Sequence, residues 1–161
     1  MDEKLLLEIL QKDARISDAS LAKMLNSTED KVKKKIEELK SSGVIKAFRT
    51  YVDWERLGEE VVTAYIEVKV TPETRTGFSD LGAQLAANDK VETIVVASGE
   101  YDLMIKVKAR SIKEISNFVT ETLAPKKEVT GTYTRFVLKT FKESGVILAD
   151  SAKGKKLVVS A

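Results

Sequence analysis

Four lysines lie within residues 31–35 of this 161-residue chain, and the chemistry they offer is attraction for phosphate. Val32, Ile36 and Leu39 recur around them at helical spacing and predict one buried stripe on an amphipathic helix. A helix that packs on one side and is cationic on the other can enter a groove of DNA, but a solvated charged face has the same pattern. The neighbouring segments must therefore decide between a DNA-binding helix and a helix that is only solvated. The cations are Lys31, Lys33, Lys34 and Lys35.

The ends of this helix are marked in the sequence. Thr28 can cap the N-terminus, and Glu29 and Asp30 place negative charge in the first turn, where it suits the helix dipole. Gly43 is free to adopt a left-handed backbone and so to end the helix. The helix is therefore predicted within residues 28–45.

Composition restricts the possible functions. The formal net charge of +2 does not by itself indicate a nucleic-acid partner, but residues 31–49 hold seven Lys or Arg residues against two acids. The absence of Cys and His excludes disulfides, thiol and imidazole catalysis and ordinary zinc sites, so we expect no metal and no cofactor. The N-terminal stretch contains acids and too short an apolar run for a signal peptide, and no stretch is long enough to span a bilayer. A cytoplasmic location is expected.

Two more amphipathic helices precede the lysine-rich one. They are predicted over residues 3–12 and from Ser17 to residue 25, with a short polar turn at Asn26 and Ser27. Two helices joined by such a turn, the second of them basic, form the helix-turn-helix arrangement of DNA-binding proteins. Their inward side chains are predicted to be Leu6, Ile9, Leu10, Leu21, Met24 and Leu25.

The pattern changes after Gly43. Residues 44–52 alternate apolar and basic side chains and are predicted to form a strand, either a wing or a connecting arm. Residues 53–60 are the predicted hinge between two domains.

The remaining sequence alternates between strand and helix patterns. Their order, βαββαβ, predicts a ferredoxin-like α+β domain with two helices on one face of an antiparallel sheet. Residues 1–52 would form the DNA-binding domain, 61–142 the ferredoxin-like domain and 143–161 a C-terminal extension. The predicted strands are 61–70, 91–98, 101–109 and 129–141, and the predicted helices are 74–88, with Phe78, Leu81, Leu85 and Ala86 inward, and 111–123, with Ile112, Ile115, Phe118, Val119 and Leu123 inward.

Four segments in this order closely resemble the Lrp/AsnC, or feast/famine, family of regulators. They are ILQKDARIS (9–17), LKSSGVIKAF (39–48), SGEYDLMIKV (98–107) and TGTYTRFVLKTFKE (130–143). The resemblance covers about residues 2–142 and implies a winged-type helix-turn-helix domain joined to a ferredoxin-like domain. It also implies a dimer, often assembled further to a tetramer or octamer, that binds a roughly palindromic operator in double-stranded DNA.

DNA contacts are assigned within this resemblance. Lys31, Lys34 and Lys35 of the helix would contact phosphate, and so would Arg49 on the arm. Ser27, Thr28 and Asp30 at the helix tip would meet base edges. Asp30 has an alternative role as an acid that only stabilises the helix dipole. The predicted DNA-binding residues are Ser27, Thr28, Asp30, Lys31, Lys34, Lys35 and Arg49.

The resemblance also implies a small-molecule effector, typically an amino acid, bound between dimers. The turn at Ser98–Asp102, which contains Gly99, would offer backbone N–H groups to a carboxylate, and Glu100 or Asp102 would meet an ammonium group. The alternative is that Gly99 only forms a hairpin turn and that the two acids are only solvated. The predicted effector-binding residues are Ser98, Gly99, Glu100, Tyr101, Asp102, Thr132, Tyr133 and Thr134.

The chain departs from the family pattern at several positions. Ser27 stands where the family usually has a hydrophobic residue, Asp30 and Lys31 replace small hydroxyl residues, and Glu100 replaces an aspartate. LAPKKEV (123–129) replaces the usual Leu-Pro-Gly-Val turn. The competing functions are an architectural DNA-binding protein without an effector and a ferredoxin-like enzyme, which the lack of His and Cys disfavours.

Overall fold

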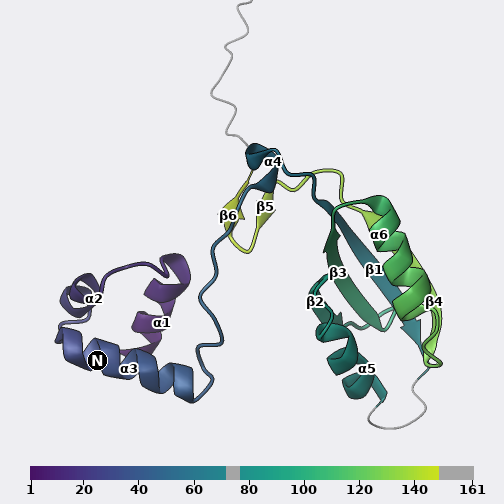
Figure 1. The fold of residues 1–161 in the computed structure, drawn as a ribbon. Helices are drawn as coiled ribbons and strands as arrows, with labels where there is room; N and C mark the ends of the chain where they lie inside the picture. Colours follow the sequence, from purple (N-terminus) through teal and green to yellow (C-terminus); the bar gives the residue numbers. More distant parts are fainter. Residues whose placement is uncertain (72–76, 149–161) are drawn as a thin grey trace, which may run out of the picture. The chain divides into compact units, whose positions relative to one another are not determined.

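The computed structural model describes residues 1–71 and 77–148 (Figure 1). The chain divides into two compact units, Met1–Val52 and Asp53–Ala161. Each unit has its own hydrophobic core. Among the described helices, none has the length and apolar character needed to cross a membrane.

The first unit consists of three helices, and each begins at a polar cap. The three capping side chains accept hydrogen bonds from backbone N–H groups of the first turn, which otherwise lack a partner. The predicted starts at Ser17 and Thr28 are confirmed. The helices are α1 (Glu3–Lys12, capped by Asp2), α2 (Asp18–Met24, capped by Ser17) and α3 (Glu29–Ser41, capped by Thr28).

The core of the first unit lies between the apolar faces of these helices. Met24 was predicted to point inward, and this is wrong: it is 57% exposed. The reason is that α2 buries Ala22 beside Leu21, which turns its buried stripe away from Met24. The buried apolar residues of this core are Leu6, Leu10, Leu21, Ala22, Leu25, Val32 and Leu39.

The predicted strand over residues 44–52 is not formed. Helix α3 ends as predicted, with Gly43 in a left-handed conformation at φ 74°. The backbone that follows has no regular secondary structure. The alternating side chains suit a strand, but a strand also needs a neighbour to accept its backbone hydrogen bonds, and the described residues of this unit contain no other strand.

The second unit starts with the one-turn helix α4 (Trp54–Leu57). Asp53 caps it, and Gly58 ends it with φ 83°. The hinge role predicted for residues 53–60 stays a prediction.

A four-stranded antiparallel sheet dominates the second unit, with strand order β2-β3-β1-β4 (Figure 1). This order and the element sequence βαββαβ confirm the predicted ferredoxin-like fold. The strands are β1 (Val62–Val70), β2 (Val91–Val96), β3 (Leu103–Ala109) and β4 (Val129–Phe136). The helices are α5 (Gly77–Ala86) and α6 (Ile112–Asn117), which continues as the π-helical segment η1 (Phe118–Leu123).

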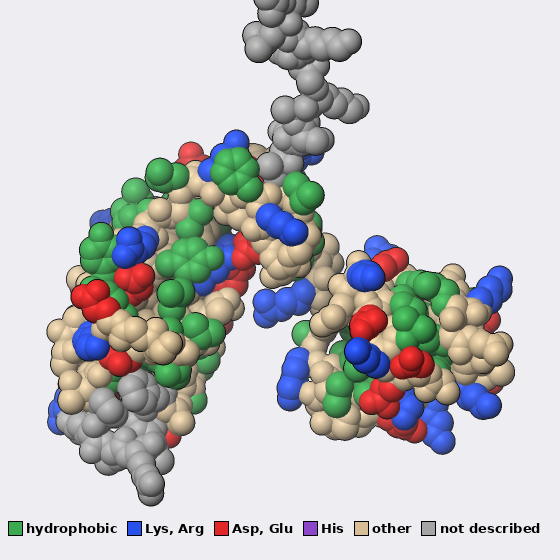
Figure 2. Space-filling model, turned by 180° about the vertical axis from the view of Figure 1, so that it is seen from behind, with side chains coloured by type: hydrophobic (Ala, Val, Ile, Leu, Met, Phe, Trp, Pro, Cys, Tyr) green, Lys and Arg blue, Asp and Glu red, His purple; other side chains and the backbone are tan. Residues whose placement is uncertain are grey.

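The two faces of the sheet differ. Along β1, Ile66 and Val68 point to an inner face that packs against α5, α6 and η1, whereas Tyr65, Glu67 and Lys69 point to an outer face. The helices lie on one side of the sheet (Figure 1). In the opposite view, hydrophobic and charged side chains are interspersed on the molecular surface (Figure 2). The buried core comprises Ala64, Ile66, Val68, Val70, Leu81, Leu85, Leu103, Ile105, Val107, Ile115, Phe118 and Leu123.

Two helix residues predicted to face this core are exposed. Ala86 follows the buried Leu85 directly, so it points about 100° away from it around the helix. Ile112 is the first residue of α6, where no preceding turn covers its side chain. The predicted helix start at residues 74–76 and the side chain of Phe78 lie outside the described part of the structure.

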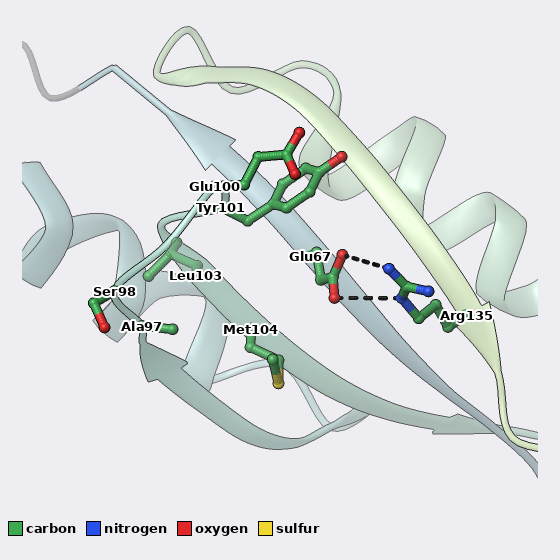
Figure 3. A pocket seen from close by; sticks show the side chains of 8 residues that line it. All are labelled: Glu67, Ala97, Ser98, Glu100, Tyr101, Leu103, Met104 and Arg135. Carbon is green, nitrogen blue, oxygen red and sulfur yellow. Dashed lines mark hydrogen bonds and ion pairs between the residues drawn. The ribbon is translucent and has the colours of Figure 1, made fainter.

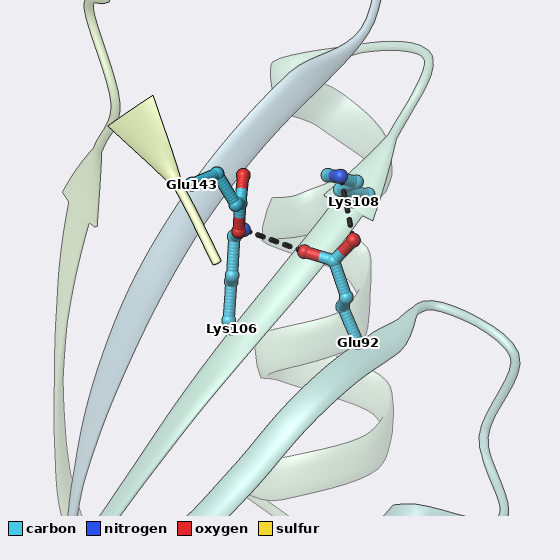
Figure 4. A network of polar contacts seen from close by, with 4 residues as sticks. All are labelled: Glu92, Lys106, Lys108 and Glu143. Atoms are coloured by element: carbon cyan, nitrogen blue, oxygen red, sulfur yellow. Dashed lines mark hydrogen bonds and ion pairs between the residues drawn. The ribbon is translucent and has the colours of Figure 1, made fainter. Parts of the chain in front are cut away.

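Strand β4 ends at Phe136, five residues before its predicted end at 141, and a small hairpin follows. The hairpin joins β5 (Lys142–Glu143) to β6 (Val146–Ile147). Glu143 forms an ion pair with Lys106 of β3, which attaches the hairpin to the outer face of the sheet (Figure 4). Residues 149–161 lie outside the described part of the chain.

Candidate DNA-binding surface and effector pocket

The N-terminal half of α3 presents unpaired cations to solvent. Lys31, Lys33 and Lys34 are exposed, and none of the three forms an ion pair with another described residue. Asp30 is exposed beside them. Lys33 was not among the predicted contacts, but it is as exposed to solvent as its two neighbours in this group.

The C-terminal half of α3 differs because its cations are neutralised within the chain. Nζ of Lys35 lies 2.8 Å from Oε2 of Glu38 and 3.7 Å from Oε2 of Glu3. The hydrogen bond and negative charge of Glu38 raise the pKa of Lys35. Nζ of Lys40 lies 2.8 Å from Oε1 of Glu37. Lys35, predicted to contact phosphate, therefore has carboxylate partners that a phosphate would have to displace.

The turn before α3 is tightly formed. Asn26 adopts a left-handed conformation at φ 47°, and the N–H of Ser27 donates to the carbonyl of Ala22 at 2.9 Å. Oγ1 of Thr28 accepts from the N–H of Lys31 at 3.4 Å, so its hydroxyl serves as the cap. Ser27 is half-buried and Asp30 is exposed at the tip of the helix. Arg49 is exposed on the irregular segment that follows.

A pocket of about 240 Å³ opens between the 97–102 turn and the outer face of the sheet (Figure 3). The turn contributes backbone and polar groups, and the strands contribute one ion pair and one thioether. Residues from four separate segments of the chain meet here. They are Glu67 of β1, Ala97, Ser98, Glu100 and Tyr101 of the turn, Leu103 and Met104 of β3, and Arg135 of β4.

Within the pocket, Glu67 and Arg135 form a bidentate ion pair (Figure 3). Nε and Nη2 of Arg135 donate to the two oxygens of Glu67 at 3.3 and 3.4 Å. This hydrogen bonding and the negative charge of Glu67 raise the pKa of Arg135. The guanidinium also lies 4.5 Å from the centre of the Tyr133 ring. The Glu67 side chain is 18% exposed and that of Arg135 is 61% exposed, so the pair is open on the arginine side.

The structure brings together three of the predicted effector residues, Ser98, Glu100 and Tyr101. Gly99 belongs to the same turn, and its φ of 137° is one that residues with side chains rarely adopt. Asp102 does not line the pocket. Its carboxylate accepts a hydrogen bond from the N–H of Val70 at 2.8 Å, so it holds the turn against β1.

The three predicted residues of β4 do not share one face. In the sheet register, Thr132 pairs with Val68 and Thr134 with Ile66, and both of these β1 residues point to the inner face. Only Tyr133, which pairs with Glu67, points to the outer face. Successive side chains on a strand alternate between faces, so a run of three consecutive residues cannot all face the turn.

The sequence prediction missed Glu67, Met104 and Arg135. Alternation along β1 was visible, but it could not show that Glu67 would lie beside an arginine 68 residues later in the chain. To place these side chains together, one must know the register of the strands, in which Tyr65 pairs with Arg135 and Glu67 pairs with Met104. Within the described residues, no group of acids has an arrangement that could hold a metal ion.

Two family models match the chain. Residues 63–147 match the Lrp/AsnC ligand binding domain, and residues 3–46 match a winged helix-turn-helix DNA-binding domain. The first match contains every residue that lines the pocket, and the second contains helix α3 with its lysines.

Curated relatives match over most of their length. The uncharacterized HTH-type transcriptional regulator YugG of Bacillus subtilis is 33% identical over 156 residues, which are 96% of this chain and 94% of the relative. The HTH-type transcriptional regulator FL11 of Pyrococcus horikoshii is 32% identical over 143 residues, 88% of this chain and 91% of the relative.

Among solved structures, the fold is similar to that of the transcriptional regulator NMB0573 from Neisseria meningitidis in complex with L-methionine. The TM-score is 0.70 at 20% identity, with 89% of this chain and 93% of the other covered. The match to the ligand binding domain over 63–147, together with the match to YugG, establishes the family. The chain belongs to the Lrp/AsnC family and is a DNA-binding transcriptional regulator.

Proposed function

We propose that this regulator responds to an α-amino acid bound in the pocket beside the Glu67–Arg135 pair. The observation that carries the proposal is the pair itself, because it places one carboxylate and one guanidinium in the same pocket. An α-amino acid carries the complementary groups, an ammonium and a carboxylate. It can therefore exchange one internal ion pair for two with the ligand, without leaving either protein charge unpaired.

The remaining lining residues suit a ligand of this size. A volume of about 240 Å³ lies below the roughly 300–1,000 Å³ typical of pockets for drug-sized ligands, which favours a single amino acid. Arg135 is the more exposed partner and can turn its guanidinium to a ligand carboxylate. Tyr101 and Met104 offer apolar contact to a side chain. The methionine complex of a protein with a similar fold supports this class of ligand.

The proposed DNA contacts follow the charge pattern of α3. Its N-terminal half supplies the unpaired cations Lys31, Lys33 and Lys34 for phosphate, and Ser27 and Asp30 lie at the tip for base edges. Arg49 would contact phosphate outside the helix. Lys35 contributes less because Glu38 and Glu3 already neutralise it.

The regulator is proposed to act as a dimer or larger oligomer on a roughly palindromic operator. The support is the outer face of the sheet, where Tyr65, Val95 and Tyr133 leave apolar surface exposed. A second copy of the chain is the simplest cover for such a face, and two-fold symmetry then presents two copies of α3 to DNA. Ligand binding would change DNA affinity to the extent that it favours one oligomeric state.

Calorimetry on the full chain tests the ligand proposal. The protein is titrated with each of the twenty amino acids, and at least one is expected to bind. Arg135→Gln is expected to weaken that binding at least tenfold, because the carboxylate loses its charged partner. Arg110→Gln, an exposed arginine outside the pocket, is expected to leave it unchanged. No binding by any amino acid would overturn the proposal.

Selection of bound DNA from a random pool tests the operator proposal. An enriched, roughly palindromic sequence, whose recovery changes when the amino acid is added, is the expected result. Recovery of all sequences alike, with or without amino acids, would instead support an architectural DNA-binding protein that has no effector.

A further inference from the structure

The charges around the pocket do not balance. Glu67 and Glu100 are the two carboxylates of its lining, and Arg135 is the one cation. The immediate surroundings do not change this, because Asp102 and Lys69 add one negative and one positive charge, 3.7 Å apart. The pocket and its rim therefore carry a net charge of about −1 at neutral pH.

The excess charge resides on Glu100. Glu67 has its partner in Arg135, and Asp102 has the N–H of Val70 and the ammonium of Lys69. Lys69 also donates to the backbone carbonyl of Glu100, not to its carboxylate. Within the described residues, the Glu100 carboxylate has neither an ion-pair partner nor a hydrogen-bond donor, and it lines the pocket (Figure 3).

We infer that Glu100 selects an effector with a positively charged side chain, that is, a basic amino acid such as lysine, arginine or ornithine. The inference rests on the proposed function and names the class of ligand for the same site. The α-ammonium and α-carboxylate of any amino acid use the Glu67–Arg135 pair, which leaves Glu100 for a second cation. A neutral ligand leaves the charge of Glu100 unpaired, and an acidic ligand adds to it.

The apolar part of the lining suits the stem of such a side chain. Tyr101 of the turn and Met104 of β3 both line the pocket and are partly exposed, so the methylene groups of a lysine can lie against them. Long basic side chains bury their stems on apolar surface while their charged ends meet a polar group. The ring of Tyr101 adds a face that attracts cations.

Calorimetry with L-lysine and L-norleucine isolates the charge, because the two ligands have the same straight carbon chain and differ in the terminal ammonium. For the unmodified protein, L-lysine is expected to bind about tenfold more tightly than L-norleucine. Glu100→Gln is expected to bring the two affinities to within about twofold, by weakening lysine rather than norleucine. Glu121→Gln, an exposed acid outside the pocket, should leave the ratio unchanged.

The outcomes distinguish this inference from the proposal on which it rests, namely that the effector is an α-amino acid. Equal affinities in the unmodified protein, tighter binding of L-glutamate than of L-lysine, or a ratio that persists in Glu100→Gln would each overturn the inference while leaving an amino-acid effector in place. Failure of all twenty amino acids to bind would overturn both.

Discussion

The carboxylate of Asp102 accepts a hydrogen bond from the backbone N–H of Val70 at 2.8 Å, across 32 residues of sequence. One backbone bond reinforces this link, because the N–H of Asp102 donates to the carbonyl of Val68. A second closes the turn itself, since the N–H of Ala97 donates to the carbonyl of Asp102. The turn that lines the pocket is thus fixed to the central strand β1. Asp102, which was predicted as an effector contact, thus has its carboxylate engaged within the chain.

Asp102→Ala is expected to lower the free energy of unfolding by about 1–3 kcal/mol, because the partly buried N–H of Val70 loses its acceptor. Urea denaturation at neutral pH measures this. The matched control is Glu100→Ala, which removes a carboxylate with no described partner from the same turn and should change stability by less than about 0.5 kcal/mol. Equal losses of unfolding free energy in the two variants would contradict the role of Asp102 in holding the turn against β1.

Lys106 attaches the C-terminal hairpin to the sheet. Its side chain is 6% exposed and lies between Glu92, at 2.7 Å, and Glu143 (Figure 4). Lys106→Met would leave two carboxylates close together without their shared cation. The expected loss of stability is about 1–3 kcal/mol, less than the roughly 3–5 kcal/mol for breaking a fully buried pair, since both acids remain partly exposed.

Hydrogen exchange tests directly whether Lys106 attaches the hairpin. The backbone amides of residues 142–148 should lose protection before those of β3, because the hairpin loses its attachment while the sheet keeps its ladder. Lys108→Met is the control, since Lys108 is more exposed and contacts only Glu92 of these acids. A hairpin that exchanges equally fast in both variants would argue against the attachment.

Glu92 makes part of this stability depend on pH. Burial alone would raise the pKa of Glu92, but hydrogen bonds from Lys106 and Lys108 outweigh it and hold the pKa below its usual value of 4.5. A carboxyl whose pKa is lower in the folded state stabilises the fold above its unfolded pKa, and this contribution is lost as pH falls through the folded pKa. Stability should therefore decline below about pH 4.5, and less steeply in Glu92→Gln. Identical pH profiles from urea denaturation would contradict this.

Sequence patterns predicted the elements of this fold better than the residues of its pocket. The periods of apolar residues depend on local geometry, so the strand at β1 and the helix ends at Thr28 and Gly43 could be inferred directly. The meeting of Glu67 with Arg135 depends on strand register, which no single segment specifies.

The wrong predictions have the same physical origin. The segment 44–52 has the side chains of a strand, yet its unit offers no described strand to pair with it. Thr132 and Thr134 were grouped with Tyr133 because they are adjacent in sequence, but alternation places them on the opposite face of the sheet. In both cases the outcome depends on the neighbouring strands of the fold, which the sequence of the segment itself does not show.

Two glycines should respond in opposite directions to the same change. Gly99 has a φ of 137°, so Gly99→Ala is expected to destabilise the second unit by about 1–3 kcal/mol through backbone strain, although no atom blocks the new methyl group. Gly82 lies within α5 with open space around it, so Gly82→Ala should stabilise the unit by roughly 0.5–1 kcal/mol. Thermal unfolding of the two variants gives the signs, and equal shifts would show that the backbone conformation of Gly99 is unimportant.

The two halves of α3 should contribute unequally to DNA binding. Lys34 is exposed and unpaired among the described residues, whereas Lys40, on the same helix, is 2.8 Å from Glu37. For each helix bound, Lys34→Ala is expected to reduce the slope of log affinity against log salt by about 0.9, as expected for one lost phosphate contact. Lys40→Ala should leave the slope nearly unchanged. Fluorescence anisotropy with a selected operator across a range of salt concentrations measures both variants. A larger effect of Lys40→Ala would mean that the C-terminal half of α3 faces the DNA, because only a cation close to phosphate releases counterions on binding.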